Sequence, residues 1–184
     1  MPTRYEIRLS GSGGQGLILA GKILAEAAVI YDKKNATQSQ SYGPEARGGA
    51  SRSEVVISDG DIIFPKAQNI DFLLSLTQKA CDKYCNDLKD GGILLIDSKF
   101  VKRIPDGNYR RFSLPIIDIA KDEVGRTITA NIVALGLITE LSGVLSRKAV
   151  ELALVDMVPK GTEEINKKAF MIGIRKAEEL KKAE

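Results

Sequence analysis

Residues 5–24, YEIRLSGSGGQGLILAGKIL, place a glycine-rich turn between two apolar segments. Residues 5–10 have the composition of a β-strand. Residues 17–31 repeat apolar side chains at helical spacing, while Lys22 and Glu26 take the opposite side. A strand, a tight turn and a helix in this order form the opening unit of folds with parallel strands. Residues 5–31 alone therefore predict an α/β protein.

The turn has glycines at the G-x-G-x-x-G spacing, at Gly11, Gly13 and Gly16. Glycine permits a tight turn and lets a ligand approach the backbone. The N–H groups that begin the following helix attract an anion such as a phosphate. A P-loop is excluded because Leu17 and Ile18 stand where that motif requires Lys and then Ser or Thr. The turn is therefore a candidate phosphate site.

Two alternatives for this turn are a nicotinamide or flavin site and a turn that serves only helix–strand packing. A dinucleotide site has an Asp or Glu about 20 residues farther on, at the end of the second strand. Asp32 has that spacing, but it lies at the end of the predicted helix. The short polar strand expected at residues 36–40 has no acidic residue. Both alternatives stay open.

The rest of the chain alternates strand-like and helix-like segments, which predicts a mostly parallel sheet with helices on both faces. The clearest strand is ILLI at residues 93–96, a continuous apolar run typical of central parallel strands. No internal repeat or linker divides the sequence. Residues 1–184 are therefore predicted to form a single three-layer α/β/α domain with a Rossmann-like sheet. Further strands are expected at residues 51–58, 71–76 and 112–117, and further helices at residues 78–88, 129–141, 146–155 and from residue 162 onward.

A second loop, YGPEARGG at residues 42–49, combines an aromatic ring, a rigid Gly-Pro turn, an acid and a base. We hypothesise that Arg47 binds an anionic group or a partner's carboxylate, because a planar guanidinium suits bidentate contacts. Glu45 would orient Arg47 or contact a neighbouring subunit, and Tyr42 would lie at the same edge. The alternative is a surface loop with an ordinary ion pair.

Asp97 ends the predicted strand at residues 93–96, at the sheet edge where open α/β proteins bind ligands. It is therefore a candidate site residue, with capping of the next turn as the alternative. A basic stretch follows, which is either a solvated connection or a surface for an acidic partner or for the phosphates of a coenzyme. Its members are Lys99, Lys102, Arg103, Arg110 and Arg111.

The composition excludes several classes of function. The chain has no His, so it has no Ser-His-Asp or Cys-His relay and no imidazole metal ligand. The two cysteines, Cys81 and Cys85, are too few for an iron–sulfur cluster or a closed zinc site, and their helical spacing predicts core packing. The net charge of +3 does not favour nucleic acid. No signal segment or membrane span is apparent, so a cytoplasmic protein is expected.

Taken together, the motifs resemble the gamma subunit of the 2-oxoacid:ferredoxin oxidoreductases, which is equivalent to the gamma domain of pyruvate:ferredoxin oxidoreductase. The Tyr-Gly-Pro-Glu-Ala-Arg-Gly-Gly version of the second loop is most similar to the 2-oxoglutarate branch. The resemblance covers nearly the whole chain. It rests on GSGGQG at 11–16 with AGKILA at 20–25, YGPEARGG at 42–49 with SRSEVVIS at 51–58, Phe64-Pro65, GGILLID at 91–97, and Asn131 with Leu135-Gly136.

This resemblance implies an enzyme of several subunits that converts a 2-oxoacid and coenzyme A into an acyl-CoA, carbon dioxide and reduced ferredoxin. Thiamine diphosphate and Mg would lie between alpha and beta subunits, and iron–sulfur clusters in a ferredoxin-like delta subunit. This chain would have no catalytic residue and no tightly bound cofactor, but would lie near coenzyme A. The residues it would contribute are Gly11, Gly13, Gly14, Gln15, Gly16, Tyr42, Glu45, Arg47 and Asp97.

Two other classes of function are weighed against this one. A stand-alone nucleotide-binding module would bind a nucleotide as a monomer and catalyse nothing. A small nicotinamide-dependent oxidoreductase would need a proton donor, and no tyrosine of this chain is followed by Lys at Tyr-x-x-x-Lys spacing. An isolated gamma chain can also form homodimers through an apolar surface meant for its partners.

Overall fold

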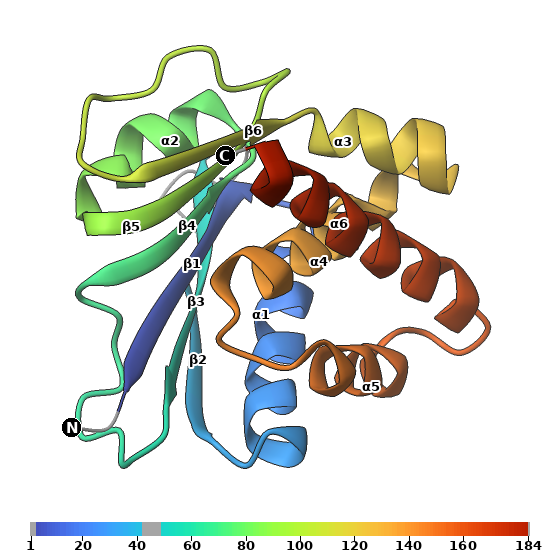
Figure 1. Cartoon of the computed structure of the whole chain (residues 1–184), viewed down its shortest axis with the longest axis horizontal. Helices are drawn as coiled ribbons and strands as arrows, with labels where there is room; N and C mark the ends of the chain where they lie inside the picture. The colour runs from blue at the N-terminus through green and yellow to red at the C-terminus, as the bar shows by residue number, and fades with distance from the viewer. Residues whose placement is uncertain (1–2, 42–48, 184) are drawn as a thin grey trace.

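The computed structural model describes residues 3–41 and 49–183, and its centre is a six-stranded sheet (Figure 1). The strand order is β2-β3-β1-β4-β5-β6. Strand β3 runs antiparallel to both of its neighbours, whereas β1, β4, β5 and β6 are parallel to one another. The predicted mostly parallel sheet is therefore confirmed. The strands are β1 (Arg4–Ser12), β2 (Asn35–Ser41), β3 (Ala50–Ser58), β4 (Ile70–Ser75), β5 (Leu88–Asp97) and β6 (Arg110–Leu114).

Helices cover the two faces of the sheet unequally (Figure 1). One face carries α1 (Leu17–Glu26), α4 (Ala130–Ser142), α5 (Arg147–Met157) and α6 (Glu163–Ala183). A π-helical turn, Ala27–Tyr31, extends α1. Among the described residues, the only helix on the other face is α2 (Gln78–Tyr84), followed by the 3₁₀ turn Cys85–Asp87. The α/β/α layering is confirmed, and in the part of the chain that the structure describes α2 alone forms one of the two helical layers.

Two apolar cores fill the two sides of the sheet. The larger core packs Ile7, Leu9 and Phe72 against the helices of the thick layer, and the smaller one packs Leu73 and Leu94 against α2. The smaller core also contains Cys81 and Cys85, which are buried and free. The prediction that these thiols serve packing is confirmed.

Helices α4 and α6 cross with their backbones in contact. A Cβ atom at Gly136 would lie 2.2 Å from the carbonyl oxygen of Phe170, and one at Gly173 would lie 2.1 Å from the carbonyl oxygen of Val133. Only glycine fits at such a crossing. This contact fixes the position of α4, which begins beside the glycine-rich turn.

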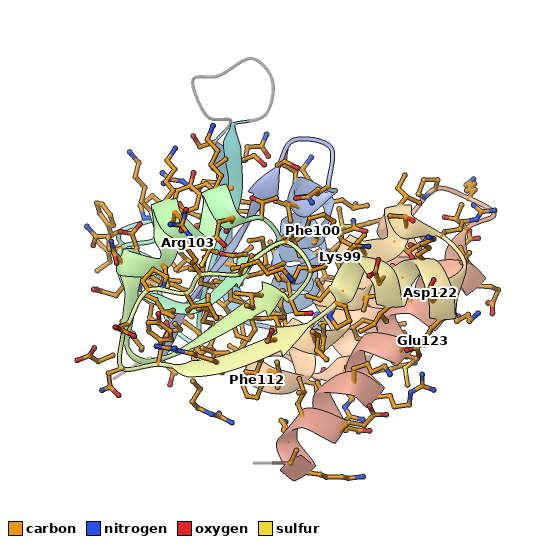
Figure 2. The ribbon with its side chains drawn as sticks, turned by 90° about the horizontal axis from the view of Figure 1, so that it is seen from above. Lys99, Phe100, Arg103, Phe112, Asp122 and Glu123 are labelled. Carbon is orange, nitrogen blue, oxygen red and sulfur yellow. The ribbon has the colours of Figure 1, made fainter. Side chains whose placement is uncertain are left out.

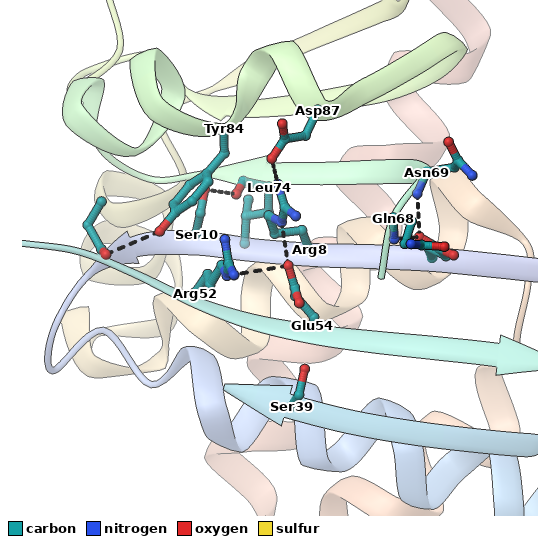
Figure 3. Close-up of polar contacts among 12 residues, drawn as sticks. Arg8, Ser10, Ser39, Arg52, Glu54, Gln68, Asn69, Leu74, Tyr84 and Asp87 are labelled. Carbon is teal, nitrogen blue, oxygen red and sulfur yellow. Dashed lines mark hydrogen bonds and ion pairs between the residues drawn. The ribbon is translucent and has the colours of Figure 1, made fainter. Parts of the chain in front are cut away.

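A buried charged cluster lies between the sheet and α2 (Figure 3). The Arg8 Nε atom donates to Glu54 Oε1 at 2.7 Å, and the guanidinium also pairs with Asp87. The same guanidinium lies 5.2 Å from the centre of the Tyr84 ring. The buried charges are thus paired, as burial requires, and they hold α2 against β1 and β3.

The structure corrects two sequence-based boundaries. Residues 112–117 were expected to form one strand, but β6 ends at Leu114 and α3 (Ile116–Ile119) follows, because Pro115 lacks the N–H that a strand would need. A π-helical turn, Ala120–Val124, continues α3. The helix expected to reach residue 88 ends earlier, and Leu88 instead begins β5. None of the described helices is long and apolar enough to span a membrane.

Candidate functional site

The glycine-rich turn connects β1 to α1 at the carboxyl edge of the parallel strands. Gly16 is the N-cap of α1 and has a left-handed backbone with φ of 72°, which favours glycine. The Asn131 Nδ2 atom donates to the Gly16 carbonyl at 3.1 Å, and a Cβ at Gly16 would lie 2.4 Å from that nitrogen. The turn is therefore fixed from outside by the first turn of α4.

Gln15 closes the turn from within. Its Oε1 atom accepts the Ser12 N–H at 2.8 Å, and a Cβ at Gly11 would lie 2.1 Å from the same oxygen. Gly13 and Gly14 differ, since a Cβ at either position would meet nothing within 4 Å. The turn is thus shaped by Gly11, Gln15 and Gly16. The backbone at Gly13 and Gly14 remains accessible to a ligand.

Three hollows meet at this turn, and Gly14 lines all of them. The first, of about 320 Å³, lies against the starts of α4 and α6 and is lined by Asn131 and Asn166. The second, of about 310 Å³, lies toward β3. The third, of about 300 Å³, lies beneath Ile128, a largely exposed apolar side chain. The turn is thus accessible from several sides.

Each of the first two hollows is lined by one arginine. Arg126 lines the first, is exposed, and its guanidinium makes no hydrogen bond or ion pair with any described residue. Arg52 lines the second, where its Nε lies 3.4 Å from Glu54 Oε1 and its guanidinium lies 5.5 Å from the Tyr84 ring centre. With the positive end of the α1 dipole, these cations favour an anionic ligand.

Asp97 lies at the carboxyl edge but is fully buried. Its Oδ1 atom accepts the Lys99 N–H and its Oδ2 atom accepts the Ile117 N–H, both at 2.9 Å. Both carboxylate oxygens are thus engaged by the backbone. Asp97 therefore caps the backbone that follows β5, which was the alternative to its binding a ligand.

Tyr42, Glu45 and Arg47 lie outside the described residues. The segment that contains them joins β2 to β3, whose facing residues Ser41 and Arg52 both line the second hollow. The hypothesis for Arg47 therefore stays a prediction.

Asp32, which has the spacing of a ribose-binding acid, has a different role. Its carboxylate accepts both the backbone N–H and the hydroxyl of Ser146, at 2.7 Å each. Ser146 in turn caps α5, at the start of the helix expected at residues 146–155. Asp32 thus joins the end of the first helical segment to the start of α5.

Lys99 and Arg103 of the basic stretch, both labelled in Figure 2, form local ion pairs. Lys99 Nζ lies 2.7 Å from Asp118 Oδ1, and this hydrogen bond raises the pKa of the Lys99 amine. Arg103 lies 3.3 Å from Asp82. These pairs match the expected solvated connection more closely than an open anion site.

Sequence reasoning missed Arg126 and the role of Asn131 at the turn. Asn131 was noted only as part of the motif that carries the family resemblance, and its contact with Gly16 spans 115 residues. The spacing of residues along the sequence does not predict a contact between such distant positions. Arg126 follows Gly125 in an exposed connection whose position only the fold defines.

The fold and site define a class of protein: an α/β domain with open backbone and two arginines gathered at the carboxyl edge of its parallel strands. Among the described residues, no group of three or more Cys, Asp or Glu side chains could hold a metal ion. Comparison with known proteins identifies the family within this class. The family model for pyruvate ferredoxin/flavodoxin oxidoreductase matches residues 6–176, and the chain belongs to this family.

The similar proteins are mostly single subunits of matching length. The 2-oxoglutarate synthase subunit KorC of Methanocaldococcus jannaschii is 52% identical over 179 residues, which cover 96% of each chain. The crystal structure of the keto/oxoacid ferredoxin oxidoreductase gamma subunit from Geobacter sulfurreducens has 58% identity and a TM-score of 0.89, covering 95% of this chain and 97% of that one. The resemblance to gamma subunits seen in the sequence is confirmed: this is a gamma-type subunit of a 2-oxoacid:ferredoxin oxidoreductase.

A more distant structure shows the same fold within a longer chain. The 2-oxoglutarate:ferredoxin oxidoreductase from Magnetococcus marinus, solved with 2-oxoglutarate, coenzyme A and succinyl-CoA, is 23% identical with a TM-score of 0.81. The match covers 95% of this chain but 31% of that one. The fold therefore occurs both as a separate subunit and as part of a larger polypeptide.

Proposed function

We propose that this chain is the gamma subunit of a cytoplasmic 2-oxoglutarate:ferredoxin oxidoreductase, and that its glycine-rich turn contacts coenzyme A. The reaction joins the succinyl group of 2-oxoglutarate to the thiol of coenzyme A, releases carbon dioxide and passes the electrons to ferredoxin. Alpha and beta subunits would hold thiamine diphosphate and Mg, and a ferredoxin-like delta subunit would hold the clusters. The similarity to KorC subunits supports the choice of substrate.

The observation that carries the coenzyme A contact is the open backbone at Gly13 and Gly14 beside an unpaired arginine. Coenzyme A carries phosphates, which bind well to N–H groups at a helix N-terminus. The Arg126 guanidinium is positioned near the turn without a partner among the described residues. The turn would therefore hold the phosphates, while the reacting thiol would lie on the partner subunits.

The assignment to a complex is tested by affinity purification of the tagged chain from its native cells under anaerobic conditions. We expect co-purification of thiamine- and cluster-bearing subunits, with coenzyme A-dependent reduction of a viologen dye on 2-oxoglutarate. Comparison with pyruvate and other 2-oxoacids tests the substrate. A chain that elutes alone, inactive and carrying a nucleotide would instead establish the stand-alone binding module.

The coenzyme A contact is tested in the assembled complex with Gly14→Val. Gly14 has φ of 83° and open space around it, so the new side chain would obstruct the backbone that a phosphate approaches. Gly91→Val is the matched control, because Gly91 has φ of 76° and equally open space but lies in β5. We expect the KM for coenzyme A to rise only in Gly14→Val. An equal KM in both variants would contradict the contact.

A further inference from the structure

The first hollow at the glycine-rich turn is lined by two asparagines that are otherwise buried. Asn131 is 5% exposed and Asn166 is 9% exposed, and both line this space of about 320 Å³. The walls around them are apolar, with Leu19 of α1, Ile132 of α4 and Ile165 of α6 among the lining side chains. A hollow of this size, with apolar walls and a few fixed polar groups, is typical of a site for a small molecule.

Both asparagines use their amide nitrogens within the chain. The Asn131 Nδ2 atom donates to the Gly16 carbonyl at 3.1 Å. The Asn166 Nδ2 atom donates to the Thr162 carbonyl at 2.9 Å and to the Thr162 hydroxyl at 3.0 Å. A carbonyl oxygen can only accept, so these contacts fix which end of each amide is the nitrogen. The other end is the Oδ1 oxygen, which in both asparagines makes no hydrogen bond with any described residue.

These two Oδ1 atoms face the hollow. Every buried side-chain nitrogen or oxygen atom of the described residues has a hydrogen-bond partner, so an oxygen without one must be accessible. Since the rest of each asparagine is buried, the hollow that it lines is where its oxygen is accessible. The hydroxyls of Thr129 and Thr162 line the same hollow and donate to the carbonyls of Arg126 and Pro159, at 2.7 and 2.6 Å. Apart from Arg126, the polar side chains of the hollow therefore offer acceptors only.

A wall of acceptors selects a ligand group that donates hydrogen bonds. An amino group donates, whereas an oxo group would set its own lone pairs against the Asn131 and Asn166 oxygens. The exposed Arg126 guanidinium beside them favours a phosphate close to the donating group. The adenine of an adenosine phosphate has a flat ring for the apolar walls, an exocyclic amino group and a phosphate one sugar away. The amides of a pantetheine arm fit less well, because each brings a carbonyl oxygen that needs a donor.

We propose that this hollow binds the adenine base of coenzyme A, and that Asn131 and Asn166 select the base through its exocyclic amino group. The inference rests on the proposed contact between the turn and the phosphates of the coenzyme, and extends that contact to the base. Gly14 lines the hollow and is also part of the open backbone of the turn, so the base and the phosphates would lie side by side. Asn131 then has two functions: its nitrogen fixes the turn and its oxygen accepts from the base.

The experiment compares coenzyme A with its deaminated form, in which hypoxanthine replaces adenine, in the assembled complex with 2-oxoglutarate and a viologen dye. We expect the KM for the deaminated coenzyme to be about thirtyfold higher at an unchanged kcat, because an acceptor replaces the donor. Equal KM values for the two coenzymes would overturn the inference. Adenosine 3′,5′-bisphosphate, which has the base but no thiol, is expected to inhibit in competition with coenzyme A. Inhibition that coenzyme A does not relieve would also overturn it.

Asn166→Leu removes one acceptor and keeps the size of the side chain. We expect the KM for coenzyme A to rise about tenfold and the ratio of the two KM values to fall to about three. This ratio does not depend on the fraction of the complex that is folded. Asn35→Leu is the matched control, because the Asn35 amide also donates to a carbonyl, that of Gly60, but is exposed on β2. The control should keep the ratio of the unaltered complex.

The outcomes separate this inference from the proposed function. If Gly14→Val raises the KM for coenzyme A while Asn166→Leu leaves the ratio unchanged, the phosphate contact stands and the base site is overturned. If Gly14→Val leaves the KM unchanged, the proposed contact at the turn fails, and the base site fails with it.

Discussion

The two edges of the sheet carry loops that are built in opposite ways. The glycine-rich turn presents bare backbone, because Gly13 and Gly14 face open space. The connection between β3 and β4, residues 59–69, which we name the amino-edge loop, presents side chains such as Ile63, and Arg4 and Glu6 fix the backbone beneath them. A phosphate needs close N–H donors, whereas a protein partner needs a fixed apolar shape. The comparison teaches that one sheet can present open backbone at one end of its strands and fixed side chains at the other.

The largest effect is expected from breaking the anchor of the amino-edge loop with Glu6→Ala. The change leaves the Gln68 and Asn69 N–H groups and the Nε atom of Arg4 without their acceptor, so the free energy of unfolding should fall by about 3 kcal/mol. Chemical denaturation measures this fall, and hydrogen exchange should quicken at residues 68 and 69. Glu164→Ala, at an exposed position, is the control. Equal stability of the two variants would refute the anchoring role.

A smaller loss of stability is expected from Gly16→Ala at the opposite edge. The left-handed φ and the close approach of Asn131 together should cost about 2 kcal/mol. Gly143→Ala has a φ of 62° and open space, so it should cost only about 1 kcal/mol. Adding Asn131→Ala to Gly16→Ala tests the contact directly. If the two single glycine variants unfolded at the same denaturant concentration, Asn131 would not fix the turn.

Arg126→Gln sharpens the comparison by separating ligand binding from stability. The guanidinium has no partner among the described residues, so the unfolding midpoint should not change. Loss of one charged phosphate contact should raise the KM for coenzyme A about tenfold in the assembled complex. Arg103→Gln, exposed on the basic stretch, is the control. An unchanged KM in Arg126→Gln would remove this residue from the site.

The smallest effect is expected from Ile63→Ser in the isolated chain. Because this side chain is almost fully exposed, its removal should change the free energy of unfolding by no more than about 0.5 kcal/mol. Ile57→Ser, in the buried part of β3, should destabilise the chain strongly by comparison. A large loss in Ile63→Ser would mean that Ile63 packs within its own chain.

The sequence was most informative where local periodicity decides the structure. Local patterns alone predicted the strand, turn and helix of residues 5–31, the buried run at 93–96 and the helix that starts at residue 146, and all are confirmed. The error at residues 112–117 arose because a short apolar run around Pro115 fits either a strand or a helix.

The candidate site was only partly predictable, because contacts between distant segments shape it. The glycine spacing located the turn, but did not distinguish glycines that shape it from those that leave it open. Asp97 has the position of a ligand residue, yet its oxygens accept the N–H groups of Lys99 and of Ile117, and Ile117 lies 20 positions farther along the chain. The anchoring of the amino-edge loop likewise joins residues about 60 positions apart.

The crossing of α4 and α6 has a consequence for the order in which the molecule is made. Residues on these two helices line the hollow at the glycine-rich turn, although the turn itself is near the start of the chain. A ribosome therefore releases the turn early and its lining last. Until the helix containing Gly173 can dock on Gly136, the nascent chain has the glycine-rich turn without the helices that line its hollow. The hollow at the turn is thus completed only when the last helix of the fold has been synthesised.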